Sequence, residues 1–147
     1  MNIEECIYCK VAQDEIAVKV IYEDELTVCF LEENPINPGH CVVTTKEHYT
    51  SVTEMAPEVL AAMSATAQKA GRALNRLKQW DGFNIVMQNG ECAGQMIRHA
   101  HFHIIPRVGT DGFYFNWRKQ ALSDEVMQST ADELIEKWKK VHEQDED

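Results

Sequence analysis

The sequence is short of proline, glycine, basic residues and long apolar runs, and each shortage excludes a class of protein. Four prolines and seven glycines among 147 residues exclude a low-complexity or fibrous chain. Charges interrupt the most apolar segments well short of a membrane span, so we expect no membrane partner. Only 14 Lys and Arg stand against 24 Asp and Glu, and no basic run is longer than Lys139-Lys140, so we expect no nucleic-acid partner.

The N-terminal residues and the cysteines indicate the compartment. Residues 1–5 are acidic and unlike a signal peptide, so a cytoplasmic location is the expectation. Five cysteines, an odd number in a chain with no recognisable secretory signal, argue against a disulfide framework. Cys6 and Cys9 form a C-x-x-C pair. The other three stand singly, in apolar or turn contexts where inert or incidental thiols are expected: Cys29, Cys41 and Cys92.

The order of β-rich and amphipathic segments predicts an α+β domain. Short apolar or β-branched runs bounded by turn residues predict five strands at 18–22, 26–31, 40–45, 83–88 and 99–106. Apolar residues recur at three- and four-residue steps from 56 or 57 to about 77, which predicts the main helix. A final helix is expected after a Ser123 cap. Short links between the strands favour an antiparallel five-stranded sheet with one long helix and a C-terminal helix.

No repeat or linker indicates a second domain, so we expect residues 1–147 to form one domain. Its core should span about residues 4–110, with 111–147 as a C-terminal extension that contains the last helix. The aromatic cluster at 113–117 follows the last strand, and core packing is as good a reading of it as a contact with ligand or subunit.

Three alternate histidines, His99, His101 and His103, are the most informative feature of the chain. Alternate side chains of an extended strand point the same way, so we expect the three imidazoles on one face. Imidazole titrates near neutral pH and serves as a nucleophile, a proton carrier or a metal ligand. Two mechanisms therefore compete: transfer of a phosphoryl-type group through a covalent histidine, and a catalytic metal held by all three histidines.

Amide groups before this strand favour phosphorus chemistry. In covalent transfer one imidazole attacks phosphorus, while neighbouring donors stabilise charge on the oxygens. A three-histidine zinc site keeps a position open for water, but it rarely needs a crowd of amides. The loop that leads into the strand carries such donors, as side chains or as backbone amides: Gln88, Asn89, Gly90, Gly94 and Gln95.

Residues 88–107, Gln-Asn-Gly-Glu-Cys-Ala-Gly-Gln-Met-Ile-Arg-His-Ala-His-Phe-His-Ile-Ile-Pro-Arg, closely resemble the signature of the histidine triad (HIT) family. Segments 6–10, 20–24 and 34–40 resemble the family too, so the likeness covers about residues 4–110. The resemblance implies a homodimeric nucleotide-binding hydrolase or nucleotidyltransferase. Such enzymes cleave at the α-phosphate of nucleoside phosphoramidates or dinucleoside polyphosphates, through a nucleotidyl-histidine intermediate, and the expected ligand is a purine nucleotide or a derivative.

The resemblance also implies roles by position. His101 corresponds to the nucleophile that becomes nucleotidylated, and His103 to the residue that holds a phosphate oxygen. Gln88 and Gln95 occupy amide positions near the phosphate, and His40 matches a histidine that supports the catalytic row.

Two positions depart from the family pattern. Glu32 stands where many members carry an Asp that accepts hydrogen bonds from the ribose hydroxyls. Met96 stands where many carry a Ser or Thr that contacts the phosphate or the leaving group. These departures keep a second reading open, a catalytically slow nucleotide-binding or interaction module of the same fold.

Cys6 and Cys9 have the spacing of a zinc knuckle, and a closed structural site needs two further Cys or His ligands. A C-x-x-C pair without metal is the alternative. The resemblance to a bacterial-type subset of the family implies that His48 and His99 complete the site. Structural zinc on these four residues would anchor His99 and stiffen the strand without touching substrate.

Overall fold

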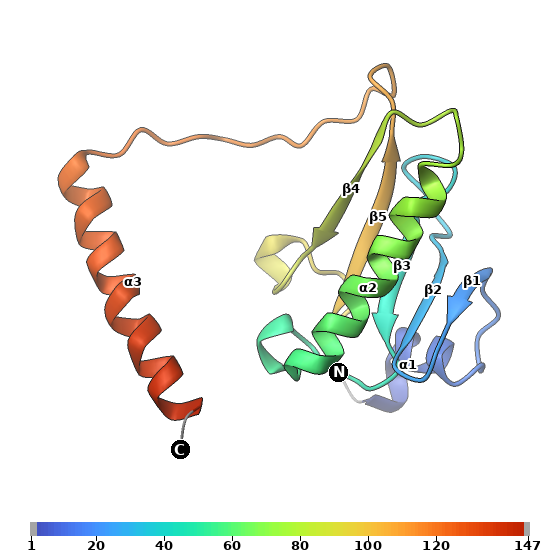
Figure 1. The fold of residues 1–147 in the computed structure, drawn as a ribbon, viewed down its shortest axis with the longest axis horizontal. Helices are drawn as coiled ribbons and strands as arrows, with labels where there is room; N and C mark the ends of the chain where they lie inside the picture. Colours follow the sequence, from blue (N-terminus) through green and yellow to red (C-terminus); the bar gives the residue numbers. More distant parts are fainter. Residues whose placement is uncertain (1–2, 146–147) are drawn as a thin grey trace. The chain divides into compact units, whose positions relative to one another are not determined.

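The computed structural model describes residues 3–145, and the chain divides into two compact units, one up to Phe113 and one from Tyr114 onward. The first unit holds a five-stranded antiparallel sheet in the order β1-β2-β3-β5-β4 (Figure 1). The predicted α+β fold with this sheet is confirmed. Its strands are β1 (Val20–Glu23), β2 (Thr27–Leu31), β3 (Cys41–Thr45), β4 (Gly82–Met87) and β5 (His101–Arg107).

Two α-helices of this unit lie at opposite faces of the sheet, and three short 3-10 turns connect the elements. The helices are α1 (Ile7–Ala12) and α2 (Pro57–Leu74), and the turns are η1 (Ile3–Glu5), η2 (Val52–Glu54) and η3 (Glu91–Ala93). Helix α2 has Pro57 in its first turn as predicted, but it ends three residues before the predicted end at 77. The reason is that the amides of residues 76 and 77 donate to carbonyls three residues earlier, instead of four as in an α-helix, so the chain ends in a tighter turn.

The pleat of the central strands divides the core between the two faces. Alternate side chains pack with α2: Cys29, Cys41, Val43 and Ile104 join Ala67 and Leu74. The intervening ones pack with α1: Val28, Phe30 and Val42 join Cys6, Tyr8, Cys9 and Val11. Strand β3 is buried along its whole length because both of its faces are covered. Helix α1, with its two cysteines, is therefore part of the core on the face opposite α2.

A glycine allows α2 to approach β4 closely. A Cβ atom at Gly71 would lie 2.3 Å from the ring of Phe83, so no larger residue fits at this crossing without displacing the ring.

His99 does not belong to the last strand, and the prediction of a strand from 99 to 106 is wrong at its start. Pairing between β3 and β5 ends at Thr44 and His101. Beyond that pair, the Ala100 amide donates to the Tyr49 carbonyl outside the ladder, at 2.6 Å. The chain therefore bends at His99, and the regular strand begins only at His101, although the Tyr8 ring contacts the rings of both histidines.

The second unit contains α3 (Asp124–Asp145). Ser123 Oγ accepts a hydrogen bond from Val126 N, at 3.3 Å, as expected for a helix N-cap. Several apolar side chains of α3 are exposed within this chain: Met127, Leu134, Ile135 and Val141. Among the helices that the structure describes, none combines the length and the apolar character needed to cross a membrane.

Candidate functional site

His101 and His103 lie on the sheet face opposite α2, and His40, which immediately precedes β3, joins them. The rings of His101 and His103 are 4.9 Å apart between centroids. His40 Nε2 lies 2.9 Å from His103 Nδ1, and His103 Nε2 lies 3.3 Å from His101 Nε2. Three imidazoles therefore form one hydrogen-bonded row, but its members are His40, His103 and His101 rather than the three histidines of the sequence triplet.

Backbone groups at both ends fix which ring nitrogen of each histidine carries the proton. Ile36 N donates to His40 Nδ1, so neutral His40 carries its proton on Nε2 and donates it to His103. His103 then carries its own proton on Nε2 and donates to His101 Nε2. At the other end, the His99 carbonyl accepts a hydrogen bond from His101 Nδ1, at 2.7 Å. His101 Nε2 is thus left with a lone pair, which a nucleophile requires.

The surroundings hold these imidazoles neutral. Burial lowers the pKa of His40, His101 and His103, and the charge of Glu32 opposes this shift at each of them. A neutral His101 keeps its lone pair near neutral pH, and a neutral His103 can still donate from Nε2.

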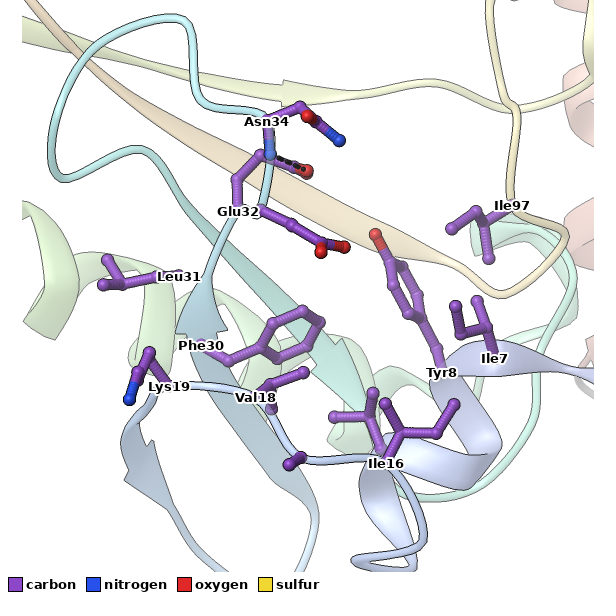
Figure 2. A pocket seen from close by; sticks show the side chains of 13 residues that line it. Ile7, Tyr8, Ile16, Val18, Lys19, Phe30, Leu31, Glu32, Asn34 and Ile97 are labelled. Atoms are coloured by element: carbon purple, nitrogen blue, oxygen red, sulfur yellow. Dashed lines mark hydrogen bonds between the residues drawn. The ribbon is translucent and has the colours of Figure 1, made fainter.

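A pocket of about 660 Å³ is lined by two residues that lie next to the row, Tyr8 and Glu32, but by none of the three histidines (Figure 2). Its walls are mainly apolar, and Glu32 lies at one side with its carboxylate turned inward. Tyr8 lines the pocket, and its ring meets the His101 ring edge-on, with centroids 5.0 Å apart and planes at 90°. Burial, followed by the charge of Glu32, raises the pKa of the Tyr8 hydroxyl, which therefore stays protonated. The pocket suits a flat apolar group attached to a polar one.

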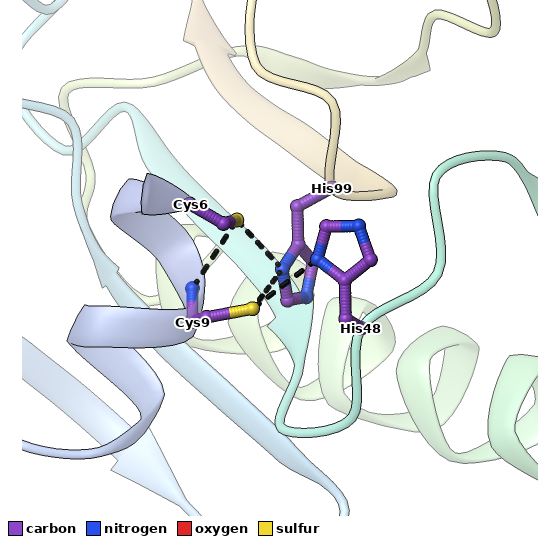
Figure 3. A group of neighbouring side chains, drawn as sticks. All are labelled: Cys6, Cys9, His48 and His99. Atoms are coloured by element: carbon purple, nitrogen blue, oxygen red, sulfur yellow. Dashed lines mark hydrogen bonds between the residues drawn. The ribbon is translucent and has the colours of Figure 1, made fainter. Parts of the chain in front are cut away.

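Cys6, Cys9, His48 and His99 converge beside α1, as the sequence predicted for a metal site (Figure 3). Their ligand atoms all lie within 4.8 Å of one another. His99 Nδ1 is 3.4 Å from Cys6 Sγ and 3.5 Å from Cys9 Sγ, and His48 Nδ1 is 3.2 Å from Cys9 Sγ. Two sulfurs and two imidazole nitrogens are the donors of a closed structural zinc site.

The protonation of this group also fits a cation. The Thr45 carbonyl accepts a hydrogen bond from His99 Nε2 at 2.8 Å, so the lone pair of His99 is on Nδ1 and faces the sulfurs. Burial lowers the pKa of His99 to about 4, which keeps the ring neutral. Burial likewise raises the pKa of Cys9 to about 11, with Cys6 adding to the effect. A bound cation would offset the cost of buried thiolates.

A second set of potential ligands, Glu32, His40 and His103, is poorly suited to a metal. His40 Nδ1 already accepts the Ile36 N–H, so its proton is on Nε2, the atom that faces His103. That atom has no lone pair for a cation. Among the described residues, His101 belongs to neither potential metal group, which argues against a metal held by all three histidines of the triplet.

The predicted amide residues have different surroundings. Gln95 is buried, and its side chain is committed to the backbone: Oε1 accepts from Gly90 N, and Nε2 donates to the carbonyls of Thr50 and Ile97. These contacts hold the loop in place, and the predicted phosphate contact of Gln95 stays a prediction. Met96 is 87% exposed and lines neither described pocket.

Gln88 is half-buried beside Gly94, a glycine with a φ of +92°. A Cβ at Gly94 would lie 2.5 Å from Gln88 Nε2, so the glycine both turns the chain and leaves space for this amide. Gln88 thus stays a candidate phosphate contact, whereas the role of Met96 stays a prediction.

Sequence reasoning missed Tyr8, although a signal was present. Tyr8 lies between Cys6 and Cys9, so a metal ion bound by those cysteines would also fix the position of the tyrosine. Its ring also meets that of His99, with centroids 6.1 Å apart. The C-x-x-C segment therefore supplies both the thiols of the possible metal site and one wall of the pocket.

His101 and His103 lie on β5 and His40 lies just before the neighbouring strand β3, an arrangement that can be compared with known domains. The model of the HIT domain matches residues 13–110. The chain belongs to the HIT family. A HIT-like protein of Methanocaldococcus jannaschii is 46% identical over 107 residues, covering 73% of this chain and 82% of its own.

Two relatives carry names of activities. The adenosine 5′-monophosphoramidase hnt1 of Schizosaccharomyces pombe is 30% identical, over 91% of this HIT protein and 98% of its own length. The adenylylsulfatase HINT3 of Arabidopsis thaliana is 37% identical, over 73% of this chain and 54% of its own. Relatives of this kind support nucleotide hydrolysis as the general activity of the family.

Solved structures agree with the fold. A HIT family protein from Bacillus anthracis superposes with a TM-score of 0.84 at 31% identity, covering 91% of this chain and 97% of its own. A Zn-bound histidine triad family protein from Mycobacterium smegmatis has a TM-score of 0.72 at 31% identity, covering 81% and 86% of the two chains.

Proposed function

We propose that this HIT protein hydrolyses or transfers the nucleotidyl group of a purine nucleotide derivative, with His101 as the nucleophile. The observation that carries the proposal is the fixed protonation of the histidine row, which leaves a lone pair on Nε2 of His101, whose ring contacts Tyr8 of the pocket wall. The activities named for the fungal and plant relatives support the substrate class.

The reaction has two displacements at phosphorus. His101 Nε2 attacks the α-phosphorus, and the bond to the leaving group breaks with its electron pair going to that group. The imidazole ring becomes positively charged, and the His99 carbonyl, which accepts from Nδ1, stabilises this charge. His103 Nε2–H turns from His101 to a phosphate oxygen. Water or another acceptor then attacks phosphorus, its proton balances the electron pair taken by the leaving group, and His101 departs with its lone pair restored.

The pocket supplies the binding energy. Its apolar walls suit a purine base, and we assign the ribose hydroxyls to the Glu32 carboxylate, which points into the pocket. We assign a phosphate contact to Gln88, for which Gly94 leaves space. Base, ribose and phosphate would then follow one another from the apolar wall towards His101.

Structural zinc on Cys6, Cys9, His48 and His99 belongs to the same proposal and places this protein in the zinc-containing, bacterial-type subset of the family. The convergence of the four ligand atoms supports it, as does the Zn-bound mycobacterial neighbour. When bound, zinc would hold α1 against the bend before β5 and supply no chemistry to the substrate. The ring of Tyr8 and the carbonyl of His99 would be fixed with it.

A homodimer is the expected assembly. Strand β4 is an edge strand with an exposed Ile85, and α3 exposes Met127, Leu134 and Val141 within the single chain. A second copy that covers these apolar side chains would account for both surfaces. Sedimentation of the full chain should then give the mass of two chains.

A substrate panel tests the function. Adenosine 5′-monophosphoramidate, adenosine 5′-phosphosulfate and diadenosine polyphosphates share an adenylyl group but differ in the leaving group. We expect turnover of at least one of them, and loss of it in His101→Ala with AMP binding retained in calorimetry. AMP binding without turnover of any compound would instead support the slow nucleotide-binding module.

A further inference from the structure

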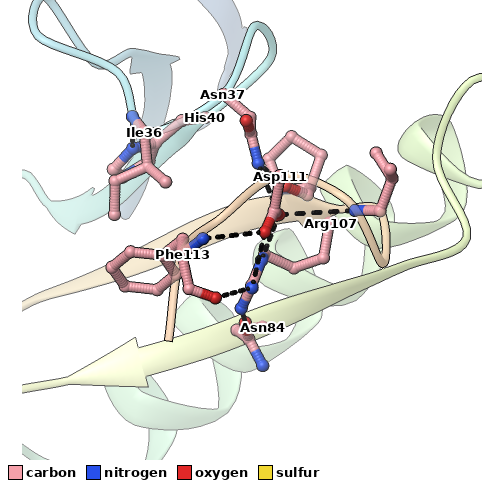
Figure 4. Close-up of polar contacts among 9 residues, drawn as sticks. Ile36, Asn37, His40, Asn84, Arg107, Asp111 and Phe113 are labelled. Carbon is pink, nitrogen blue, oxygen red and sulfur yellow. Dashed lines mark hydrogen bonds and ion pairs between the residues drawn. The ribbon is translucent and has the colours of Figure 1, made fainter. Parts of the chain in front are cut away.

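The Asp111 carboxylate connects the end of β5 to the loop that precedes His40 (Figure 4). Arg107 binds it through two hydrogen bonds, from Nε to Oδ2 at 2.6 Å and from Nη2 to Oδ1 at 3.0 Å. Asn37 Nδ2 donates to the same carboxylate at 3.0 Å. All three side chains meet where the loop before His40 contacts the end of β5.

Asn37 ties the loop to the sheet in two further ways. Its Nδ2 also donates to the Pro106 carbonyl of β5 at 2.8 Å, and its own carbonyl accepts the His40 amide at 3.0 Å. The neighbouring residue, Ile36, is the one whose N–H donates to His40 Nδ1. The position of that N–H therefore depends on how Asn37 holds the loop.

We propose that Asn37, Asp111 and Arg107 form a positioning network that fixes the protonated nitrogen of His40, and through it those of His103 and His101. If the loop shifts, the Ile36 N–H no longer faces His40 Nδ1, and His40 is free to carry its proton on either nitrogen. His103 then loses the donor that keeps its proton on Nε2, next to His101. The catalytic consequence rests on the proposed function, whereas the effect on the histidine protons does not.

Asp111 has the properties of a fixed anchor. Its side chain is 6% exposed, and its oxygens also accept hydrogen bonds from the amides of Val108 and Phe113. The Arg107 guanidinium, followed by these backbone and side-chain donors, holds the pKa of the carboxyl far below its usual range. A carboxylate that is charged and surrounded by donors resists movement, because each hydrogen bond to the charged group is strong.

Asn84 offers a matched control for Asn37. Its Oδ1 accepts from Arg107 Nη1 at 2.9 Å, so it touches the same ion pair. It lies on β4, however, and makes none of the described contacts to the loop before His40. Asn37→Ala and Asn84→Ala each remove one carboxamide from the network, but only the first releases the loop.

The experiment follows imidazole protonation by two-bond ¹H–¹⁵N NMR on the full chain of each variant, without ligand. We expect the parent and Asn84→Ala to show His40 and His103 protonated on Nε2, and Asn37→Ala to show His40 exchanging between its two forms. With adenosine 5′-monophosphoramidate as probe, kcat should fall roughly tenfold in Asn37→Ala with KM unchanged, and stay within about twofold in Asn84→Ala.

Unchanged histidine protonation in a folded Asn37→Ala would overturn the proposal, and so would an equal effect in Asn84→Ala. Backbone amide spectra show whether each variant is folded, and Asn37→Ser is the second variant if Asn37→Ala is not. If the parent turns over no probe while the NMR result holds, the proposed function fails and the positioning network stands.

Discussion

His40 Nε2 and His103 Nδ1 lie 2.9 Å apart, and both imidazoles are held with a pKa below the ordinary value of 6.5, chiefly by burial. A hydrogen bond between two neutral rings requires one donor and one acceptor, and the Ile36 amide decides which ring donates. His40 therefore donates this hydrogen bond to His103 only while both rings are neutral.

Acid should weaken the fold through this pair. The folded state favours neutral His40 and His103, so below pH 6.5 the unfolded chain binds more protons than the folded one. The free energy of unfolding should fall as the pH drops from 6.5 towards the folded-state pKa values, and this contribution should be constant above 6.5. NMR titration of the two ring Cε1 protons gives the midpoints. A midpoint above 6.5 for His40 would contradict the assignment.

Glu32 should govern the recognition of ribose. Glu32→Gln removes a charged acceptor worth ~1.5–3 kcal/mol per hydrogen bond, so AMP affinity should drop by roughly 10- to 100-fold. The affinity for 2′,3′-dideoxy-AMP, which lacks the hydroxyls, should hardly change. Glu32→Asp keeps the charge and should keep part of the preference. Calorimetry measures the affinity for each nucleotide. An equal loss of affinity for both would show that Glu32 does not bind the ribose hydroxyls.

Loss of either thiol should remove zinc and destabilise the protein. Cys6→Ser and Cys9→Ser each delete a ligand, whereas Cys92→Ser changes an exposed thiol outside the group and serves as the control. A ligand present at a thousandfold its Kd stabilises by about 4 kcal/mol, so we expect a loss of that order in unfolding free energy. Elemental analysis gives the metal content. Full zinc occupancy in both Cys variants would favour a metal on the triplet histidines instead.

Replacement of Gln95 should lower the stability of the protein, whereas replacement of Gln88 should lower its rate of turnover. Gln95→Ala removes the buried side chain that bonds three backbone groups, and it should cost about 1–3 kcal/mol in unfolding free energy. Gln88→Ala should change stability by less than about 0.5 kcal/mol and act on the rate. Denaturant titration and turnover assays separate the two effects. A Gln95→Ala variant that is as stable as the parent but slow in turnover would indicate that Gln95 contacts the phosphate.

The sequence predicted the sheet and the main helix because hydrophobic periodicity and turn residues are local properties. The convergence of Cys6 and Cys9 with His48 and His99 was implied by the resemblance to the HIT family. The sequence did not predict the bend at His99, which depends on a hydrogen bond from Ala100 to the distant Tyr49. It also missed Tyr8, because which wall a ring lines depends on how α1 packs on the sheet.

The backbone contacts of Gln95 could not be predicted from the sequence for a similar reason. Its three partners are backbone groups of segments around residues 50, 90 and 97, and a sequence does not show which carbonyls are left unpaired by the fold. Likewise, the link between Asn37 and Asp111 joins residues 74 positions apart.

The covalent adduct on His101 tests the central claim most directly. Rapid acid-free quenching of the full chain with adenosine 5′-monophosphoramidate, followed by peptide mapping in the mass spectrometer, should place an adenylyl group on His101. The adduct should be labile in acid and stable in base, and absent in His101→Ala. Turnover by the parent protein without any such adduct, or with the adduct on another residue, would contradict the account.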